Sequence, residues 1–380
     1  MNEDRLIQQM TKDRRALHQI PELEFNLHKT HAYVKERLES MGYTTETIAE
    51  TGLIAIKEGR ASSDETIAFR SDMDALSVSE ATGVPFSSQH PGAMHACGHD
   101  GHMALLLGLA EHLKDKPLKT NVAFLFQPAE EEPGGAKVIV EDGVLSRYNI
   151  RKIFGFHLYP ELEEGKIGLV DGPALARSGV FDVVIHGKSA HGAMPHGGND
   201  SITAALSLIN NYQSIVTKML DPFIPSVICI GTIKGGEARN IIAKQTEFNG
   251  TIRTFDEDNY RTIKHHMRTM ADNTNASFGV KVDLEITDFY PAVINDSTLF
   301  KIVNEALPQA SKRHIRPMMF SEDFSFYQQE IPGFFMMLGT RSETHGYTHP
   351  LHSCYFNFNE PVLIEGLKAY DRILEALGAL

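Results

Sequence analysis

The feature that most restricts the fold of this chain is an alternation of short apolar strands with helical stretches through its first part. Runs such as TIAFRSD, NVAFLFQP and KIFGFHL have the length and the β-branched and aromatic content of buried strands. A helical stretch at residues 102–114 lies between the first two runs, and another helix starts near residue 134. This alternation predicts an α/β domain with a mostly parallel sheet and helices on both faces.

The pattern changes between residues 173 and 292. There the order is strand, helix, two strands, helix and strand, which is the βαββαβ order of a ferredoxin-like unit. Afterwards the chain returns to the first pattern, with helices near 297–309 and 362–377 flanking the strand GFFMMLG. We therefore expect one domain built from residues 1–172 and 293–380, with residues 173–292 inserted as a second domain.

Composition excludes several classes of protein. The net charge of -13 and the pI near 5.8 argue against a nucleic-acid partner, which needs a basic surface. The three cysteines are too few and too scattered for a disulfide framework, which favours a reducing compartment. The charged N-terminus and the lack of an apolar run of about 20 residues argue against a signal peptide or membrane span. We expect a cytoplasmic protein without a membrane partner.

Polar side chains follow three of the predicted strands. These are Asp72 and Asp74 after the first, Glu130, Glu131 and Glu132 after the second, and His157 after the third. Because ligands bind beyond the carboxyl ends of the strands in open α/β sheets, these groups are expected to line one site.

The segment MHACGHDGHMA precedes the helix at 102–114 and adds Cys97 and His99 in a tight, glycine-containing turn. Taken alone, each is more often a cap, a surface group or a small core residue. A thiol nucleophile with His99 or His102 as its base is a second interpretation, but it leaves the glutamates unused. A mixed thiolate, imidazole and carboxylate set favours zinc or a similar first-row ion. Asp100 and His102 are expected to cap and line the helix start, and His95 is undecided.

Nine sequence blocks, in order and over essentially the full length, resemble one family. They are RSDMDAL, MHACGHDGHMA, FQPAEEEPGGA, GFHLYPE, SAHGAMPHGGND, GGEARNIIA, GTIRTF, SEDFSFY and IPGFFMMLG. The family is that of the di-metal amidohydrolases, which includes bacterial N-acyl-amino-acid deacylases, hippurate hydrolases and plant auxin-conjugate hydrolases. Carboxypeptidase G and aminoacylase-1 are relatives.

The resemblance implies two divalent ions (Zn, Mn, Co or Ni) per subunit. It implies as their ligands Cys97, His99, Glu131, His157 and a C-terminal histidine, with Cys97 in the bridging place. The segment THPLHSCYFNFNE offers His349 and His352, of which His352 fits the family pattern better, although Cys354 stands where proline is common.

The same resemblance implies the remaining roles. Glu130 would be the general base and acid, and Asp74 would orient a metal ligand. The inserted domain would be a lid and dimerisation domain, from which His191 reaches the partner's active site in a homodimer and stabilises the oxyanion. Asn240 and Arg253 are candidates for binding the substrate carboxylate or carbonyl, with a turn residue and a surface charge as the alternative interpretations.

The function that follows is hydrolysis of the amide bond of small N-acyl-L-amino acids, N-acetyl or N-aroyl, to a carboxylate and a free amino acid. A metallo-dipeptidase or carboxypeptidase, and a metal-binding homologue that has lost catalysis, are the alternatives. The sequence does not specify the acyl group, the amino acid or the native metal.

Overall fold

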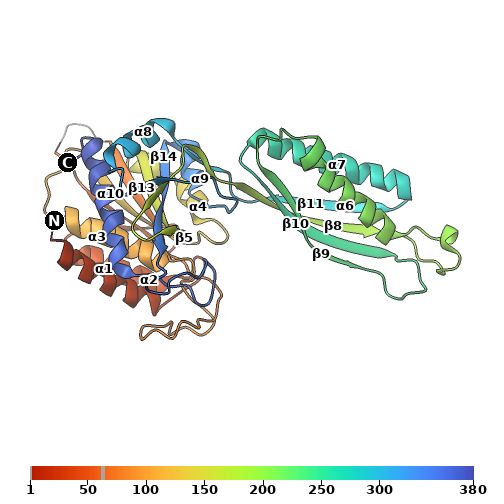
Figure 1. The fold of residues 1–380 in the computed structure, drawn as a ribbon, viewed down its shortest axis with the longest axis horizontal. Helices are drawn as coiled ribbons and strands as arrows, with labels where there is room; N and C mark the ends of the chain where they lie inside the picture. Colours follow the sequence, from red (N-terminus) through yellow and green to blue (C-terminus); the bar gives the residue numbers. More distant parts are fainter. Residues whose placement is uncertain (1, 61–64) are drawn as a thin grey trace. The chain divides into compact units, whose positions relative to one another are not determined.

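The computed structural model of the chain describes residues 2–60 and 65–380, which divide into two units (Figure 1). The first unit comprises Met1–Ala174, Val293–Arg316 and Glu322–Leu380, and the second comprises Leu175–Ala292 and Pro317–Ser321. The short segment 317–321 therefore lies with the second unit, whereas the division expected from the sequence placed it in the first.

The first unit is built on an eight-stranded sheet with the order β1-β2-β4-β3-β5-β14-β6-β13. Its strands are β1 (Thr45–Ile48), β2 (Gly52–Lys57), β3 (Thr66–Asp72), β4 (Asn121–Gln127), β5 (Ile150–Glu163), β6 (Ile167–Leu169), β13 (Lys312–His314) and β14 (Gly333–Arg341). The central strands β4, β3, β5 and β14 run parallel to their neighbours in that group. The outer pairings β1–β2, β2–β4 and β14–β6 are antiparallel.

Both faces of this sheet are covered. Every residue of β3 is buried, although successive side chains of a strand point to opposite faces. Phe69 lies in the same hydrophobic cluster as Leu105 and Leu109, whereas its neighbour Ala68 faces the other side and is also fully buried. The predicted α/β fold, with a mostly parallel sheet and helices on both faces, is confirmed.

The helices form two groups. Against one face pack α1 (Glu3–His18), α2 (His28–Ser40), α3 (His99–Leu113), α8 (Ser297–Ala306) and α10 (Leu363–Ala376). The other group is α4 (Gly135–Glu141), α5 (Val144–Arg147) and α9 (Ser325–Glu330), of which α4 packs on β4 and α5 on β5. None of the helices in residues 2–60 and 65–380 combines the length and the apolar character needed to cross a membrane.

Several short elements escaped the sequence analysis. They are β1, β6, β13, α5, α9 and a two-stranded sheet of β7 (Gly172–Leu175) and β12 (Val293–Asn295). Each is shorter than the window over which hydrophobic periodicity can be recognised. The helix expected from residue 102 begins at His99, so the ligand candidate His99 lies in its first turn.

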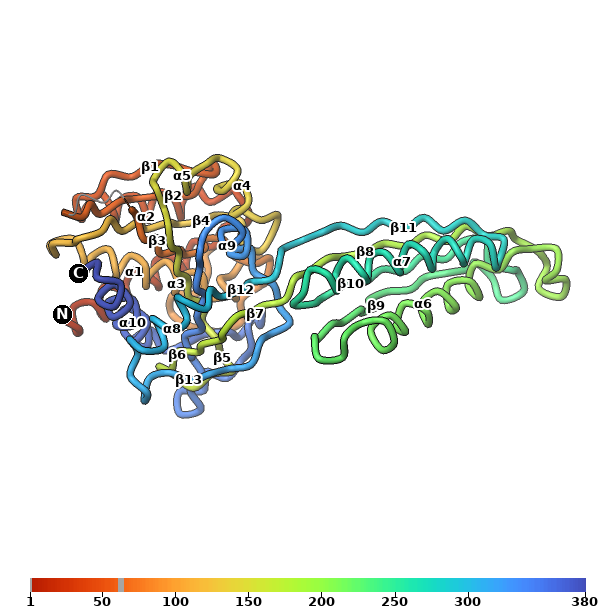
Figure 2. The backbone as a smooth tube through the Cα atoms, turned by 90° about the horizontal axis from the view of Figure 1, so that it is seen from above, coloured from red at the N-terminus to blue at the C-terminus, as the bar shows by residue number. Residues whose placement is uncertain are grey.

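The second unit has the ferredoxin-like arrangement that the sequence predicted. Its elements are β8 (Arg177–His186), α6 (Ser201–Lys218), β9 (Ser226–Gly235), β10 (Gln245–Thr254), α7 (Glu257–Phe278) and β11 (Lys281–Asp288). The sheet order is β11-β8-β10-β9 with antiparallel pairings throughout, and α6 and α7 pack on it (Figure 2). Asp200 and Asp256 cap the two helices by accepting hydrogen bonds from backbone N–H groups in the first turn.

An ion-pair cluster joins α10 to the end of α3 and generates a stability prediction. Asp371 accepts hydrogen bonds from His112 Nε2 and Lys116 Nζ, both at 2.9 Å. Burial raises the pKa of the Asp371 carboxyl, but these two partners outweigh it and lower the pKa to about 2. The carboxylate therefore stabilises the fold above its unfolded pKa, and this contribution is lost as the pH falls from about 4 towards 2.

We expect Asp371→Asn to lower the free energy of unfolding at pH 7 by about 1–2 kcal/mol, after allowance for solvent screening. Urea unfolding of both proteins between pH 7 and pH 3 measures the difference, which should shrink towards the acid end. Asp115→Asn is the matched control, because Asp115 is exposed near the same helix end and makes no ion pair within the described part of the chain. A loss that is independent of pH would contradict the electrostatic explanation.

Candidate metal centre

Gly98 and the first turn of α3 fix the positions of Cys97 and His99. Gly98 has φ +88°, a left-handed conformation that favours glycine, and a Cβ atom there would lie 3.0 Å from Leu158 Cδ1. The turn places Cys97 just before the helix and His99 in its first turn, both buried. His99 Nδ1 lies 2.9 Å from the carbonyl oxygen of Asp74, which leaves Nε2 to face the site.

The chain bends after β4, just before the consecutive glutamates Glu130, Glu131 and Glu132. Ala129 has φ +55°, so the chain leaves the extended conformation before Glu130. The carboxylate of Asp74 accepts the backbone N–H of Glu130 on Oδ1 and that of Glu131 on Oδ2, each at 3.0 Å. Asp74 thus fixes the loop that carries both glutamates, whereas Glu132 is exposed.

Two histidines arrive from far along the chain. His157 lies in β5, with Nε2 at 3.4 Å from Cys97 Sγ. His352 donates its backbone N–H to the carbonyl of Ala96, and its Nε2 lies 3.3 Å from Glu131 Oε1. The ring centroid of His349 lies 5.2 Å from that of Tyr355, and His349 belongs to none of the groups of close donor atoms among the described residues, so His352 is the C-terminal histidine that reaches the cluster.

All five residues expected to bind metal lie together in the first unit. Their donor atoms form overlapping groups in which every pair of atoms is within 4.8 Å, namely Cys97, His99 and His157, then Cys97, Glu131 and His352, then His99, Glu130 and Glu131. Cys97, His99 and Glu131 each belong to two of these groups, and the bridging place of Cys97 remains a prediction.

The residues present fit a bound cation. His99 Nε2 is buried and makes no hydrogen bond within the described residues, and a buried polar atom without a hydrogen bond is costly. Glu131 Oε1 is also buried and has His352 Nε2 at 3.3 Å as its ion-pair partner. A metal ion would satisfy His99 Nε2 and would be in reach of Glu131. Sulfur, nitrogen and carboxylate oxygen donors together suit a first-row transition metal better than calcium or magnesium.

The histidines differ in their electrostatic surroundings. Burial lowers the pKa of His99, but Asp72 and Asp74 outweigh it and raise the pKa to about 10. At His157, burial and the neighbouring His102 lower the pKa to about 3. His157 is therefore neutral at ordinary pH, the form in which an imidazole binds a metal.

The thiol and carboxyl groups of the site lie close together and shift one another's pKa values. Burial and the carboxylates of Glu131 and Glu130 raise the pKa of the Cys97 thiol well above its usual value. Burial, Glu322 and Glu131 likewise raise the pKa of Glu130, whereas His352 and His99 outweigh burial at Glu131 and lower its pKa. The site has an excess of negative charge that a divalent cation would neutralise.

Asp72, His99 and His102 form another group of close donor atoms, but Asp72 and His102 are already occupied. Asp72 accepts a hydrogen bond on each oxygen, from His102 Nδ1 at 2.6 Å and from Arg70 at 2.7 Å. His102 Nε2 accepts the backbone N–H of Leu158 at 2.9 Å. His102 lies at the start of α3, as expected, and its ring connects Asp72 at the end of β3 to Leu158 in β5.

A buried network around Arg70 was not predicted from the sequence. Arg70 Nη2 donates to Glu322 at 2.9 Å and to Asp323 at 2.8 Å, and its Nε donates to Gln127 at 2.8 Å. These acids also approach Glu130 as a group, but their pairing with Arg70 makes them poor candidates for a further cation. The signal was an arginine inside the apolar strand TIAFRS, since a buried charge requires a partner.

Asp100 and His95 have different surroundings. Asp100 Oδ1 accepts the backbone N–H of Gly101 at 2.9 Å, as expected of a residue at a helix start. Its Oδ2 accepts from Arg14 at 2.9 Å and from His18 at 2.7 Å, which ties α1 to the start of α3. His95 is buried, and neither of its ring nitrogens has a hydrogen-bond partner in residues 2–60 and 65–380.

The other three predicted site residues belong to the second unit. His191 and Asn240 lie side by side, because the N–H of Gly192 donates to the Asn240 carbonyl at 2.8 Å, and both side chains are exposed. Arg253 donates to Ser321 Oγ and to the Met319 carbonyl at 3.2 Å. Burial lowers the pKa of Arg253. The substrate roles of these residues remain predictions.

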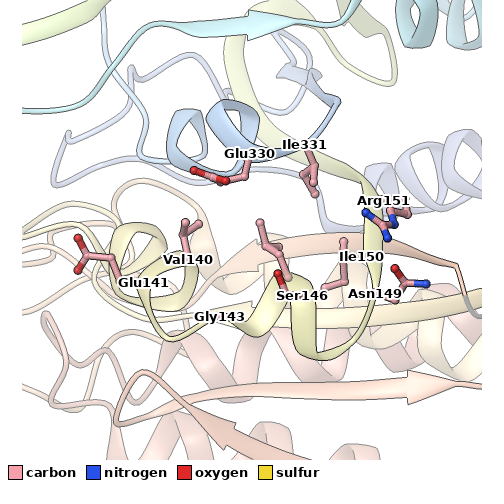
Figure 3. A pocket seen from close by; sticks show the side chains of 10 residues that line it. Val140, Glu141, Gly143, Ser146, Asn149, Ile150, Arg151, Glu330 and Ile331 are labelled. Carbon is pink, nitrogen blue, oxygen red and sulfur yellow. The ribbon is translucent and has the colours of Figure 1, made fainter.

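A cavity of about 460 Å³ in the first unit does not include the centre. Figure 3 shows it between the end of α4, α5, the first residues of β5 and the end of α9. Ile150 at its wall and His157 are at opposite ends of one stretch of β5, roughly 20 Å apart at ~3.3 Å per residue. The cavity contains none of the candidate ligands.

Comparisons with known proteins show the family of the chain. Residues 68–376 match the family model described as peptidase family M20/M25/M40. An uncharacterized hydrolase of Staphylococcus aureus strain MRSA252 is 36% identical over 373 residues, covering 96% of this chain and 97% of the relative. The N-acetyldiaminopimelate deacetylase of Bacillus velezensis is 36% identical over 357 residues, covering 92% and 93%.

This chain is also similar to a solved structure. The YxeP protein of Bacillus subtilis, described as a dinuclear metal binding peptidase from the M20 family, superposes with a TM-score of 0.85 at 33% identity. The similarity covers 98% of each chain.

The arrangement predicts which C-terminal histidine binds metal. We expect His352→Ala to weaken the binding of Zn²⁺ by more than the roughly 10–100-fold that loss of an outer partner costs, because a ligand itself is removed. His349→Ala, three residues away and exposed, is the control and should bind as the wild type does. Competition titration against a chromophoric chelator measures both. Weaker binding by the His349 variant alone would contradict the assignment.

Proposed function

Because this chain belongs to peptidase family M20/M25/M40, whose members are hydrolases, we propose that it cleaves the amide bond of small N-acyl-L-amino acids with two bound divalent ions. The products would be a carboxylate and a free amino acid. The similarity to a deacetylase over 92% of the chain supports deacylation within the broader family.

One observation carries the proposal. Glu130 lies next to the ligand candidate Glu131, and its carboxylate approaches His99 Nε2 at 3.9 Å. A carboxylate that is this close to the candidate metal ligands can serve as a base there. This pairing of ligand and base is what a metal-dependent hydrolase requires.

In the proposed mechanism, Cys97, His99, Glu131, His157 and His352 would hold the ions. When bound, the ions supply Lewis acidity that acidifies water and polarises the amide carbonyl. Glu130 accepts the proton of the attacking water and later gives it to the departing amine. Asp74 fixes the positions of Glu130 and Glu131 by accepting hydrogen bonds from their backbone N–H groups.

His191 is proposed to stabilise the oxyanion. Its Nδ1 accepts the backbone N–H of Ala193 at 3.1 Å, so the neutral ring carries its proton on Nε2. The ring is exposed and ready to donate a hydrogen bond, which suits an oxyanion. Asn240, on the adjoining loop, and Arg253 are proposed to bind the substrate carboxylate or carbonyl.

The second unit is proposed to be a lid that also forms a homodimer. Strand β9 is at the edge of its sheet, where an open row of backbone groups invites a further strand. Ile233 on β9 and Ile202 and Leu206 on α6 are large apolar side chains exposed to 48%, 38% and 54%. Burial of these side chains against a second copy would remove an apolar surface from water.

The base assignment is tested by Glu130→Gln. We expect turnover to fall by about 10²–10⁴-fold or more because the amide cannot accept the proton, while Zn²⁺ affinity stays near that of the wild type. The assay is release of free amine from N-acetyl and N-benzoyl amino acids with added Mn²⁺, Co²⁺ or Zn²⁺, against a sample treated with EDTA.

Glu132→Gln is the matched control, since the same substitution two residues away changes an exposed side chain. It should turn over at the wild-type rate. If the Glu130 variant turns over substrate at the wild-type rate, the assignment of Glu130 as the base is wrong. If the wild-type protein hydrolyses no acyl-amino acid, the proposed substrate class is wrong.

The dimer is tested by Leu206→Glu, which places a charge on the proposed apolar contact. We expect sedimentation velocity to show a species of half the wild-type mass and amine release to be lost, with Zn²⁺ binding retained. Asn211→Glu changes an exposed residue on another side of α6 and should leave the mass unchanged. A wild-type protein that sediments as a monomer and is fully active would contradict the proposal.

A further inference from the structure

The hydrogen bonds of His102 fix where its ring carries a proton. A backbone N–H can only donate, so the contact of 2.9 Å from Leu158 N makes His102 Nε2 an acceptor. The proton then lies on Nδ1, which donates to Asp72 Oδ1 at 2.6 Å. Asp72 is held in turn by Arg70, and both Asp72 and His102 are buried.

Leu158 links His102 to a candidate ligand. The carbonyl oxygen of Leu158 lies 2.7 Å from His157 Nδ1, so His157 donates there and presents Nε2 as its ligating nitrogen. The peptide groups on the two sides of Leu158 are therefore held at both ends, by His102 on the N–H and by His157 on the C=O.

The sheet explains why a side chain is needed at this place. Strand β5 pairs with β3 only as far as Gly155 opposite Arg70, and beyond that point the last residues of β3, Ser71 and Asp72, continue to pair with β4. On its other side, β5 continues to pair with β14 at His157 and Leu158. His102 takes the place of the missing strand partner for the Leu158 N–H.

We propose that His102 is a positioning residue for the metal centre, which holds the Leu158 peptide so that His157 presents Nε2 to the metal. This inference rests on the proposed metal centre. His102 acts through the backbone of Leu158 and is not itself a ligand, because both of its ring nitrogens are engaged in hydrogen bonds.

Two substitutions separate the contacts of His102. In His102→Gln the amide oxygen takes the place of Nε2 and can accept the Leu158 N–H. In His102→Asn the shorter amide takes the place of Nδ1, keeps the contact with Asp72 and leaves the Leu158 N–H without its acceptor. The full-length protein is used, freed of metal and titrated with Zn²⁺ against a chromophoric chelator, with Co²⁺ absorption as the second readout.

We expect H102N to bind Zn²⁺ about 10–100-fold more weakly than the wild type and to show a changed Co²⁺ spectrum. H102Q should keep the wild-type spectrum and nearly the wild-type affinity. The melting temperature of the metal-free protein, measured alongside, should fall in both variants because each loses one buried contact.

Three outcomes would overturn the inference. If H102N melts earlier but binds Zn²⁺ as the wild type does, His102 only stabilises the fold. If H102N and H102Q lose affinity equally, the contact with Leu158 is not the one that matters. If the wild-type protein binds neither Zn²⁺ nor Co²⁺, the proposed metal centre is wrong and this inference is wrong with it. If the wild-type protein binds both ions and H102N binds them equally well, only this inference is wrong.

Discussion

A guanidinium buried in the middle of a parallel sheet has to be neutralised where it lies, and the surroundings of Arg70 follow from that requirement. Its charge is met by Asp72 on the same strand and by Glu322 and Asp323 from the distant segment before α9. Removing Arg70 would leave these three buried acids without their cation, and an uncompensated buried charge costs about 3–5 kcal/mol. The network therefore joins the carboxyl end of β3 to a part of the chain that arrives much later, and it does so directly beneath the candidate centre.

The same concentration of acids governs the chemistry above it. Cys97 and Glu130 have raised pKa values because carboxylates surround them in a buried place, and Glu131 keeps its charge through His352 and His99. A cation that enters such a site must displace the proton of the thiol, so metal affinity and pH are linked. The candidate ligands are thus close together despite their charge repulsion, which a bound cation would relieve.

Much of this arrangement could be predicted from the sequence because it depends on local pattern. The strand end that leads to Glu130 and Glu131, and the turn that presents Cys97 and His99, are visible as short segments with polar residues at defined places. His157 was expected after the end of a strand, but it lies inside β5, which continues to Glu163. The contacts of Arg70 and His102 could not be read in this way, since their partners lie far along the chain and depend on how β3 diverges from β5. The surroundings of Arg253 were unpredictable for a related reason, because the segment 317–321 belongs to the second unit.

That short segment limits how the protein can be divided. Ala176 donates its N–H to the carbonyls of Met318 and Phe320, and Arg253 donates to Met319 and Ser321, all within the second unit. A fragment of residues 175–292 expressed alone would lack these acceptors, so the ferredoxin-like unit is not a self-contained module that can be cut out or exchanged between relatives with two breaks in the chain. Any chimera has to carry two stretches of sequence together, and the second of them ends one residue before the acids that neutralise Arg70.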